Sequence, residues 1–205
     1  MHFAHMKRCM KIRSRILLAT LFALAALGCG GGSVAASAPQ AETAPPPVEQ
    51  TAAEPVVGNF SLRDVDGVSR TLSDYLGTHV IVVSYFATWC APCQKELVAL
   101  ESLYQTYQNR GVQILAVAMD LPETRGEVRP LVKKLGLSFP VLIDEELKAA
   151  DLFNPRREAP FSLVINANRE RIWSHMGYVP GDEKALEGVI QSALAAREAS
   201  ETAAP

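Results

Sequence analysis

The strongest structural signals of this chain lie in the segment Val80-Ile-Val-Val-Ser-Tyr-Phe-Ala-Thr-Trp-Cys-Ala-Pro-Cys93. Its first seven residues form a nearly continuous apolar run, β-branched at the start, which predicts a central strand buried on both faces. Residues 93–109 then carry apolar side chains at helical spacing, and Gly111 closes that helix. These side chains are Leu97, Leu100, Leu103, Tyr104 and Tyr107. The two cysteines are therefore expected where a buried strand gives way to a helix.

A cysteine at the start of a helix is chemically activated. Unpaired backbone N–H groups and the positive end of the helix dipole favour thiolate over thiol, so the pKa of Cys90 is expected to fall below about 8.5. Two cysteines at i and i+3 lie on one helical face and can close a disulfide after one has attacked a substrate. We expect Cys90 to attack and Cys93 to resolve the mixed disulfide. Pro92 falls in the first turn, where a missing N–H is tolerated.

Three other interpretations of the pair are open. Zinc usually needs four ligands, and after residue 29 the chain offers this pair with His79 and His175. A disulfide that closes so short a loop removes little entropy from the unfolded state, so it would contribute little to the stability of the fold. Coincidence fits badly with the position between strand and helix. Redox use is therefore the prediction, and a dithiol needs neither a cofactor nor a metal.

Strand and helix signals alternate along residues 56–196, which are expected to form one domain. Residues 59–62 and 68–72 flank the turn pair Asp66-Gly67 and predict a hairpin. The later predicted elements are a buried strand at 112–118, helices at 123–135 and 145–153, a short strand at 141–143, a hairpin of 161–165 with 171–174, and a helix at 182–196. Pro130 marks a late start or a kink in the first of these helices. This order predicts an α/β sandwich with a mixed central sheet flanked by helices.

The first 28 residues have the pattern of an export signal. Five basic side chains lie within residues 7–15, the apolar run 16–27 follows, and small residues end it. The run is shorter than the about 20 residues of a membrane-spanning helix, and an uncleaved anchor is the alternative. Without these five, 15 basic residues remain against 22 acidic ones, a net charge of −7. Such a charge argues against nucleic acid as the main partner.

Ala26-Leu27-Gly28-Cys29 resembles a bacterial lipobox, in which the cysteine receives a lipid after cleavage just before it. A free thiol at Cys29 is the alternative. Residues 29–55 are rich in Ala, Pro, Ser and Glu and predict a disordered tether, and residues 197–205 predict a short disordered tail. The protein is thus expected on the periplasmic side of the cell envelope, lipid-anchored to the inner or the outer membrane.

Residues 56–196 resemble the thioredoxin-like superfamily, and more closely its TlpA-like redoxin group of membrane-associated thiol–disulfide reductases. The resemblance lies in the opening strand at 57–62, the Trp-Cys-Ala-Pro-Cys motif at 89–93, the inserted segment at 139–144, Ala159-Pro160 before the strand 161–165, and Gly177 after the final hairpin. The implied fold has an N-terminal hairpin and a central insert. Departures from the group are Val98, where a proline is common, and Phe161-Ser162, where threonines are common.

The resemblance implies a substrate-binding surface. Pro160 would be cis and lie against the cysteine pair, and Ala159 would offer backbone hydrogen bonds to an incoming peptide; a trans proline that opens a strand is the alternative. Trp89, with Ala91 and Pro92, would shape the docking surface, and a core position for Trp89 is the alternative.

Glu96 matches an acidic residue that the group keeps three positions after the second cysteine. It would relay a proton or raise a thiol pKa by like-charge repulsion. A solvated helix charge is equally compatible with the spacing.

Together these features predict an enzyme that reduces protein disulfides outside the cytoplasm, with electrons from a membrane thiol–disulfide carrier. Apocytochrome c is a candidate substrate, because part of the group serves cytochrome c maturation. Two other functions are open. A peroxidase of the same fold would place Thr88 two residues before its attacking Cys90. A copper metallochaperone would need a wider cysteine spacing and a histidine better placed than His175.

Overall fold

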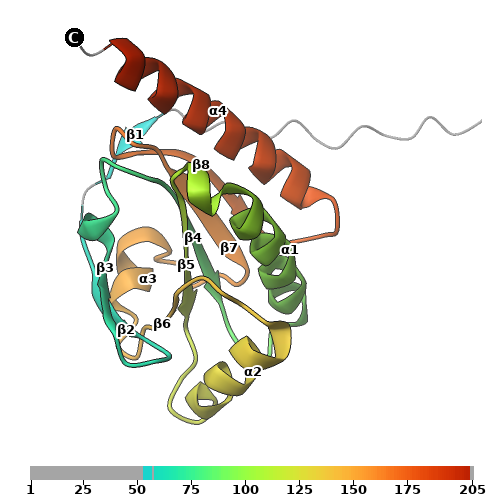
Figure 1. Cartoon of the computed structure of the whole chain (residues 1–205). Coiled ribbons are helices and arrows are strands. Elements are labelled where there is room, and N and C mark those ends of the chain that lie inside the picture. Colours follow the sequence, from blue (N-terminus) through green and yellow to red (C-terminus); the bar gives the residue numbers. More distant parts are fainter. Residues whose placement is uncertain (1–52, 57, 204–205) are drawn as a thin grey trace, which may run out of the picture. The chain divides into compact units, whose positions relative to one another are not determined.

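The computed structural model of the chain describes residues 53–56 and 58–203 (Figure 1). They form an eight-stranded mixed sheet with the strand order β1-β8-β7-β4-β5-β6-β2-β3. The strands are β1 (Glu54–Pro55), β2 (Ser61–Asp64), β3 (Ser69–Thr71), β4 (Val80–Phe86), β5 (Val112–Ala118), β6 (Val141–Ile143), β7 (Phe161–Ile165) and β8 (Glu170–Met176). The α-helices are α1 (Ala91–Tyr107), α2 (Val128–Leu135), α3 (Lys148–Phe153) and α4 (Asp182–Ala203), and the short 3₁₀ turns are η1 (Leu72–Asp74), η2 (Gln108–Arg110) and η3 (Arg125–Glu127). The predicted mixed sheet flanked by helices is confirmed.

Strand β4 occupies the centre of the sheet. It pairs in parallel with β5, from Val80 opposite Val112 to Phe86 opposite Ala118, and antiparallel with β7 on its other side. All seven residues of β4 are buried. The apolar run therefore forms the doubly covered strand that its composition predicts.

Helices cover both faces of the sheet. Helices α1, α2 and α4 pack on one face, where Leu97, Leu131 and Ile190 join a core cluster with Val80 and Val82. Helix α3 covers the other face, where Phe153 packs with Ile81 (Figure 1). Alternate residues of β4 thus face two separate cores, and the cysteine pair that follows the strand belongs to the core beneath α1, α2 and α4.

Both predicted hairpins form, and two predicted helices are shorter than expected. Strand β2 pairs with β3, and β7 with β8, each antiparallel. In the predicted helix 123–135, the residues before Val128 form the 3₁₀ turn η3, and Pro130 lies in the first turn of α2, where a proline is tolerated. The predicted helix 145–153 begins only at Lys148.

The predicted tail at 197–205 is wrong for its described part, because α4 continues to Ala203. Arg197 fixes this extension: its guanidinium donates hydrogen bonds to the carbonyls of Arg110 at 2.7 Å and Thr78 at 3.2 Å. Gly111 leaves the space for it, since a Cβ there would lie 2.0 Å from Arg197 Nη1. A stretch without apolar periodicity is thus held helical with the help of one partly buried cation.

The predicted tether also ends earlier than residue 55. Glu54 and Pro55 pair with β8 as an edge strand, opposite Arg171 and Glu170. Glu54 forms an ion pair with Arg171, and Val56 N donates to Arg169 O at 2.8 Å. The remaining tether, the export signal and Cys29 lie outside the described residues.

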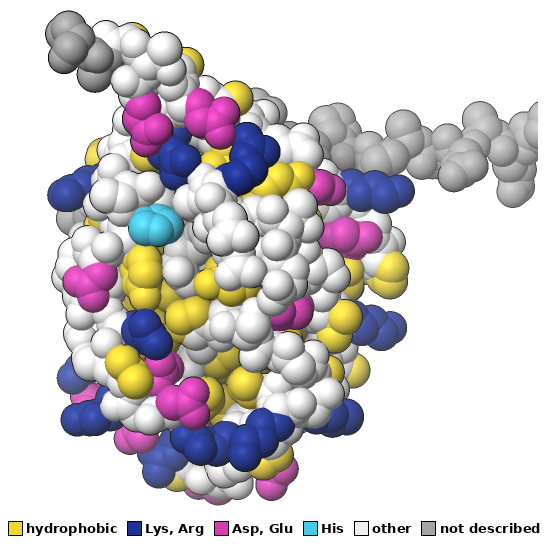
Figure 2. Space-filling model, viewed as in Figure 1, with side chains coloured by type: hydrophobic (Ala, Val, Ile, Leu, Met, Phe, Trp, Pro, Cys, Tyr) yellow, Lys and Arg dark blue, Asp and Glu magenta, His cyan; other side chains and the backbone are white. Residues whose placement is uncertain are grey.

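The surface of the described domain carries charges of both signs. In the space-filling view, acidic and basic side chains lie around the edge of the face and hydrophobic side chains gather between them (Figure 2). Within the described ranges, none of the helices has the length and apolar character needed to cross a bilayer.

Candidate active site

Cys90 and Cys93 are joined by a disulfide at the N-terminus of α1, with an S–S distance of 2.04 Å and a Cα–Cα distance of 5.2 Å. Cys90 is the N-cap of the helix, and its Sγ accepts a hydrogen bond from Cys93 N at 3.2 Å. Cys90 keeps 6% exposure, whereas Cys93 has 0%. Cys90 is therefore the more exposed of the two residues, although both are buried in the disulfide form.

Asp120 holds the loop between β4 and α1. It follows β5, is almost fully buried, and accepts hydrogen bonds from the backbone N and the hydroxyl of Thr88. Gln94, on the first turns of α1, donates to Thr88 O at 2.8 Å. The loop that presents Cys90 is therefore fixed from both the neighbouring strand and the helix.

Trp89, Ala91 and Pro92 surround the disulfide on the outside. Trp89 is 73% exposed, so it is not a core residue, and Ala91 and Pro92 are exposed as well. A large exposed indole beside a reactive group offers apolar contact area to a partner.

The peptide bond Ala159–Pro160 is cis. Phe161 pairs with Tyr85, so Pro160 lies level with the end of β4, where the chain turns toward the cysteines. Ala159 packs against the core cluster that contains Cys90 and Cys93. Pro160 is buried, and its carbonyl accepts a hydrogen bond from Gly177 N at 2.8 Å.

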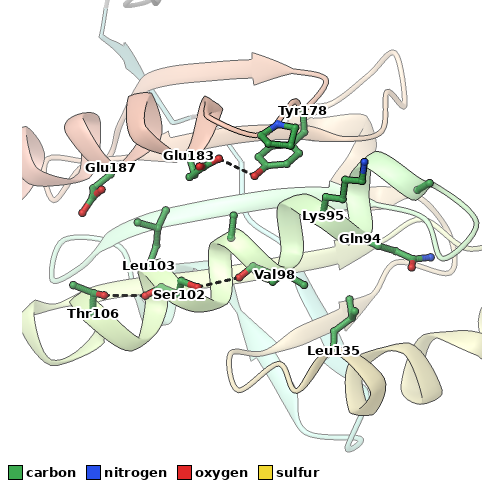
Figure 3. A pocket seen from close by; sticks show the side chains of 13 residues that line it. Gln94, Lys95, Val98, Ser102, Leu103, Thr106, Leu135, Tyr178, Glu183 and Glu187 are labelled. Atoms are coloured by element: carbon green, nitrogen blue, oxygen red, sulfur yellow. Dashed lines mark hydrogen bonds between the residues drawn. The ribbon is translucent and has the colours of Figure 1, made fainter. Parts of the chain in front are cut away.

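A groove of about 360 Å³ opens beside the disulfide. Apolar side chains dominate its wall, among them Trp89, Met119, Leu121 and Ala159, and Glu123 and Arg157 stand at its rim. A second, wider groove of about 900 Å³ runs from Ala91 along α1 between α2 and α4 (Figure 3). Val98 is exposed in this second groove.

Glu96 is a buried carboxyl, not a solvated helix charge. It is 5% exposed and accepts hydrogen bonds from Ser84 Oγ at 3.1 Å and Ser162 Oγ at 2.8 Å. Burial raises its pKa from 4.5 to about 7, the two serine hydroxyls oppose that rise, and the negative charge of Asp182 adds to it. A carboxyl that titrates near neutral pH, one turn after Cys93, can accept or donate a proton there.

Glu96 predicts a pH dependence of stability. Between pH 4.5 and 7 the folded protein holds a proton that the unfolded chain has lost, so stability decreases as pH rises through this window. We expect Glu96→Gln to remove this decrease. The free energy of unfolding of the variant should therefore rise relative to that of wild type by on the order of 3 kcal/mol between pH 4 and pH 8.

Urea unfolding of the oxidised proteins at both pH values checks this expectation. Glu198→Gln is the control, because Glu198 is exposed and should show no such gain. A difference between Glu96→Gln and wild type that stays constant with pH would refute the buried, neutral carboxyl.

Several polar residues at the site were missed in the sequence. Ser84 interrupts an otherwise apolar run, and its inward position was a usable signal for a buried partner. Asp120 lies two residues after the end of β5, a strand parallel to β4, and the carboxyl ends of parallel strands meet at one edge. Ser162 was noted only as a departure from the threonine pattern. None of these signals named Glu96 as the common partner of the two serines.

The Thr88 hydroxyl is engaged with Asp120. It donates its hydrogen to that carboxylate, which makes it a positioning group for the loop. Cys29, the predicted lipidation residue, lies outside the described residues.

Comparison with known proteins places the chain in a family. The sequence model of the AhpC/TSA family matches residues 54–174, more than half of the chain. The thiol–disulfide oxidoreductase ResA of Halalkalibacterium halodurans is 36% identical over 119 residues, which cover 58% of this chain and 65% of the relative. ResA of Geobacillus thermodenitrificans is 32% identical over 159 residues, covering 78% of this chain and 86% of the relative.

A solved structure shares the fold. It is the crystal structure of a candidate thiol:disulfide interchange protein DsbE from Chlorobium tepidum, 26% identical, with a TM-score of 0.63 over 72% of this chain and 99% of that chain. The predicted resemblance to the thioredoxin-like redoxin group is confirmed by these matches. The chain belongs to the AhpC/TSA family of thioredoxin-like proteins.

Proposed function

We propose that this protein is a thiol–disulfide oxidoreductase that reduces protein disulfides outside the cytoplasm through Cys90 and Cys93. The observation that carries the proposal is the Cys90–Cys93 disulfide at the start of α1, with exposed residues on its outer side. The relatives called ResA bear the name thiol–disulfide oxidoreductase, which supports the proposal.

The chemistry follows from the two positions. In the reduced protein, the Cys90 thiolate attacks one sulfur of a substrate disulfide, and the other substrate sulfur leaves as a thiolate. The Cys93 N–H that points at Cys90 Sγ and the N-terminus of α1 both stabilise negative charge on that sulfur. Cys93 then attacks Cys90, which releases the second substrate thiol and restores the disulfide. Two electrons pass from the dithiol to the substrate.

Cys93 must lose its proton before it can attack. It is fully buried, so water does not serve as its direct base. Glu96, with a pKa of about 7, is the nearby carboxyl suited to take this proton at neutral pH. We assign Glu96 this role.

The substrate polypeptide docks across the outer surface of the pair. Trp89, Ala91 and Pro92 supply exposed contact area, and Ala159, held by the cis bond to Pro160, supplies backbone hydrogen-bonding groups. The groove of about 360 Å³ joins Trp89 to Ala159, so it would take an apolar side chain that flanks the substrate disulfide.

Location and partners extend the proposal. The lipobox-like sequence at Cys29 supports a lipid anchor, and the basic and apolar run before it supports export. On this basis the electron donor is a membrane thiol–disulfide carrier on the periplasmic side. The resemblance to the TlpA-like group, part of which serves cytochrome c maturation, favours apocytochrome c as the candidate substrate.

Two assays of the full chain test the proposal. The reduced protein should reduce the disulfides of a protein substrate, and its reduction potential should lie near about −270 mV or below, in the range of reductants. A value near about −120 mV would indicate an oxidant. Rapid consumption of hydrogen peroxide without disulfide reduction would favour a peroxidase, the activity left open by the family match.

A further inference from the structure

A row of polar side chains crosses the sheet next to Glu96. Ser84 on β4 pairs with Ser162 on β7, and Ser162 pairs with His175 on β8. Directly paired residues project from the same face of a sheet, so the three side chains lie side by side. Both serines are buried and donate to Glu96, whereas His175 is partly exposed. The row therefore leads from the buried carboxyl toward solvent.

A small cavity joins Glu96 to the outer end of this row. Its wall includes Glu96, Trp173, His175, Tyr178 and Asp182, and it offers about 10 Å³. That is about the room that one water molecule needs, provided that polar partners surround it. The cavity thus connects groups of α1, β8 and α4 at a scale suited to a single water.

Trp173 gives a second sign of a polar occupant. Its side chain is 3% exposed, and within residues 53–56 and 58–203 its Nε1 has no hydrogen-bond partner. The indole stacks on the His175 ring with centroids 5.6 Å apart and lines the same cavity. A buried N–H of this kind is normally satisfied, and a water in the cavity would accept its hydrogen bond.

His175 and Asp182 form the outer side of the cavity. His175 Nε2 lies 3.3 Å from Asp182 Oδ2, and their side chains are 39% and 31% exposed. The same Asp182 oxygen accepts a hydrogen bond from Val179 N at 2.8 Å. This bond fixes the Asp182 side chain at the start of α4. This pair touches both the cavity and solvent.

We propose that the His175–Asp182 pair is the exit for the proton that Glu96 takes from Cys93, with one water in the cavity as the bridge. The proposal rests on the proposed function and names the second half of its proton path. Cys93 S–H gives its proton to Glu96 as its thiolate attacks Cys90. The proton then passes through the water to the imidazole and leaves to solvent, so Glu96 returns to the carboxylate for the next turnover.

The other ionisable groups that face the cavity are already engaged. Tyr178 donates its phenol hydrogen to Glu183 at 2.8 Å (Figure 3), and Glu183 also accepts a hydrogen bond from Gly181 N. Strands β4 and β7 contribute only the serine hydroxyls to Glu96. Asp182 faces Glu96 as a like charge and disfavours a negative carboxylate there. An imidazole can accept a proton at one ring nitrogen and donate from the other, which makes His175 the suited carrier.

His175→Gln tests the exit. Glutamine can keep a hydrogen bond to Asp182 but cannot carry a proton, so a merely structural role would survive the change. We expect the steady-state rate with which the protein reduces a small disulfide over repeated turnovers, with an excess of a thiol reductant to regenerate the dithiol, to fall by about tenfold near pH 7 in dilute buffer. Concentrated imidazole should restore the rate by carrying the proton instead.

His79→Gln is the matched control. His79 precedes the first residue of β4, at the opposite end of that strand from Cys90, and contacts Thr78 and Tyr75. Its rate should equal wild type in both buffers. In a Glu96→Gln background, His175→Gln should have no further effect, because the proton no longer enters this path.

The outcomes separate the two proposals. If wild type exchanges disulfides and His175→Gln matches it, or is slow without recovery in imidazole, the proton exit is overturned and the proposed function stands. If wild type shows no exchange through Cys90, the proposed function itself fails. Should His175→Gln unfold, His175→Asn serves as the second variant under the same criteria.

Discussion

Cys90→Ser is expected to lower the rate of disulfide reduction by about a thousandfold or more, the order seen when an enzyme loses its nucleophile. Serine has nearly the same size, so the cap of α1 should survive, since serine is also a favoured N-cap. Its hydroxyl does not ionise near neutral pH, however, and cannot attack a disulfide. The rate is followed with an aromatic disulfide whose thiolate product absorbs visible light.

Cys29→Ser is the matched control for this loss. It removes another of the four cysteines of the chain, one that the account assigns to lipid attachment and not to exchange. The rate at which this variant reduces the soluble aromatic disulfide should therefore stay at the wild-type value. If Cys90→Ser also kept that rate, the assignment of Cys90 as the nucleophile would be untenable.

Cys93→Ser is expected to stop the reaction halfway. Cys90 can still attack, but no second thiol releases the substrate, so a covalent complex should accumulate to nearly one substrate per protein. Turnover should fall as far as in Cys90→Ser. Non-reducing electrophoresis and intact-protein mass spectrometry measure the complex, and a reductant should cleave its disulfide bond.

The same assay on Cys90→Ser discriminates between the two sulfurs. Cys93 has no exposure in the structure, so this variant should form little complex. Accumulation in Cys90→Ser and not in Cys93→Ser would reverse the two roles.

Much of the sheet could be predicted because its centre depends on local patterns. The run Val80–Phe86 is apolar throughout and forms the central strand, and the turn pair Asp66-Gly67 lies between the paired strands β2 and β3. Helix α1 follows from its apolar spacing and its proline in the first turn. These signals lie within a few residues of each other, so sequence alone reports them.

The rest depends on contacts between distant residues. The extension of α4 to Ala203 rests on Arg197, which reaches carbonyls more than 80 positions earlier in the chain. The burial of Glu96 likewise depends on Ser84 and Ser162 from two different strands. A helix charge at that spacing is compatible with either solvent or core, and only the packing of α1 on the sheet decides between them.

In the proposed mechanism, Cys90 carries the reactive, anionic sulfur of the pair. The most direct test of this assignment is the rate at which iodoacetamide modifies each thiol of the reduced protein as pH is varied, with the modified residue identified by mass spectrometry. We expect Cys90 to react first and to reach half of its full reactivity below about pH 8.5, the pKa of a free cysteine. Faster modification of Cys93, or a Cys90 that reacts only above that pH, would contradict it.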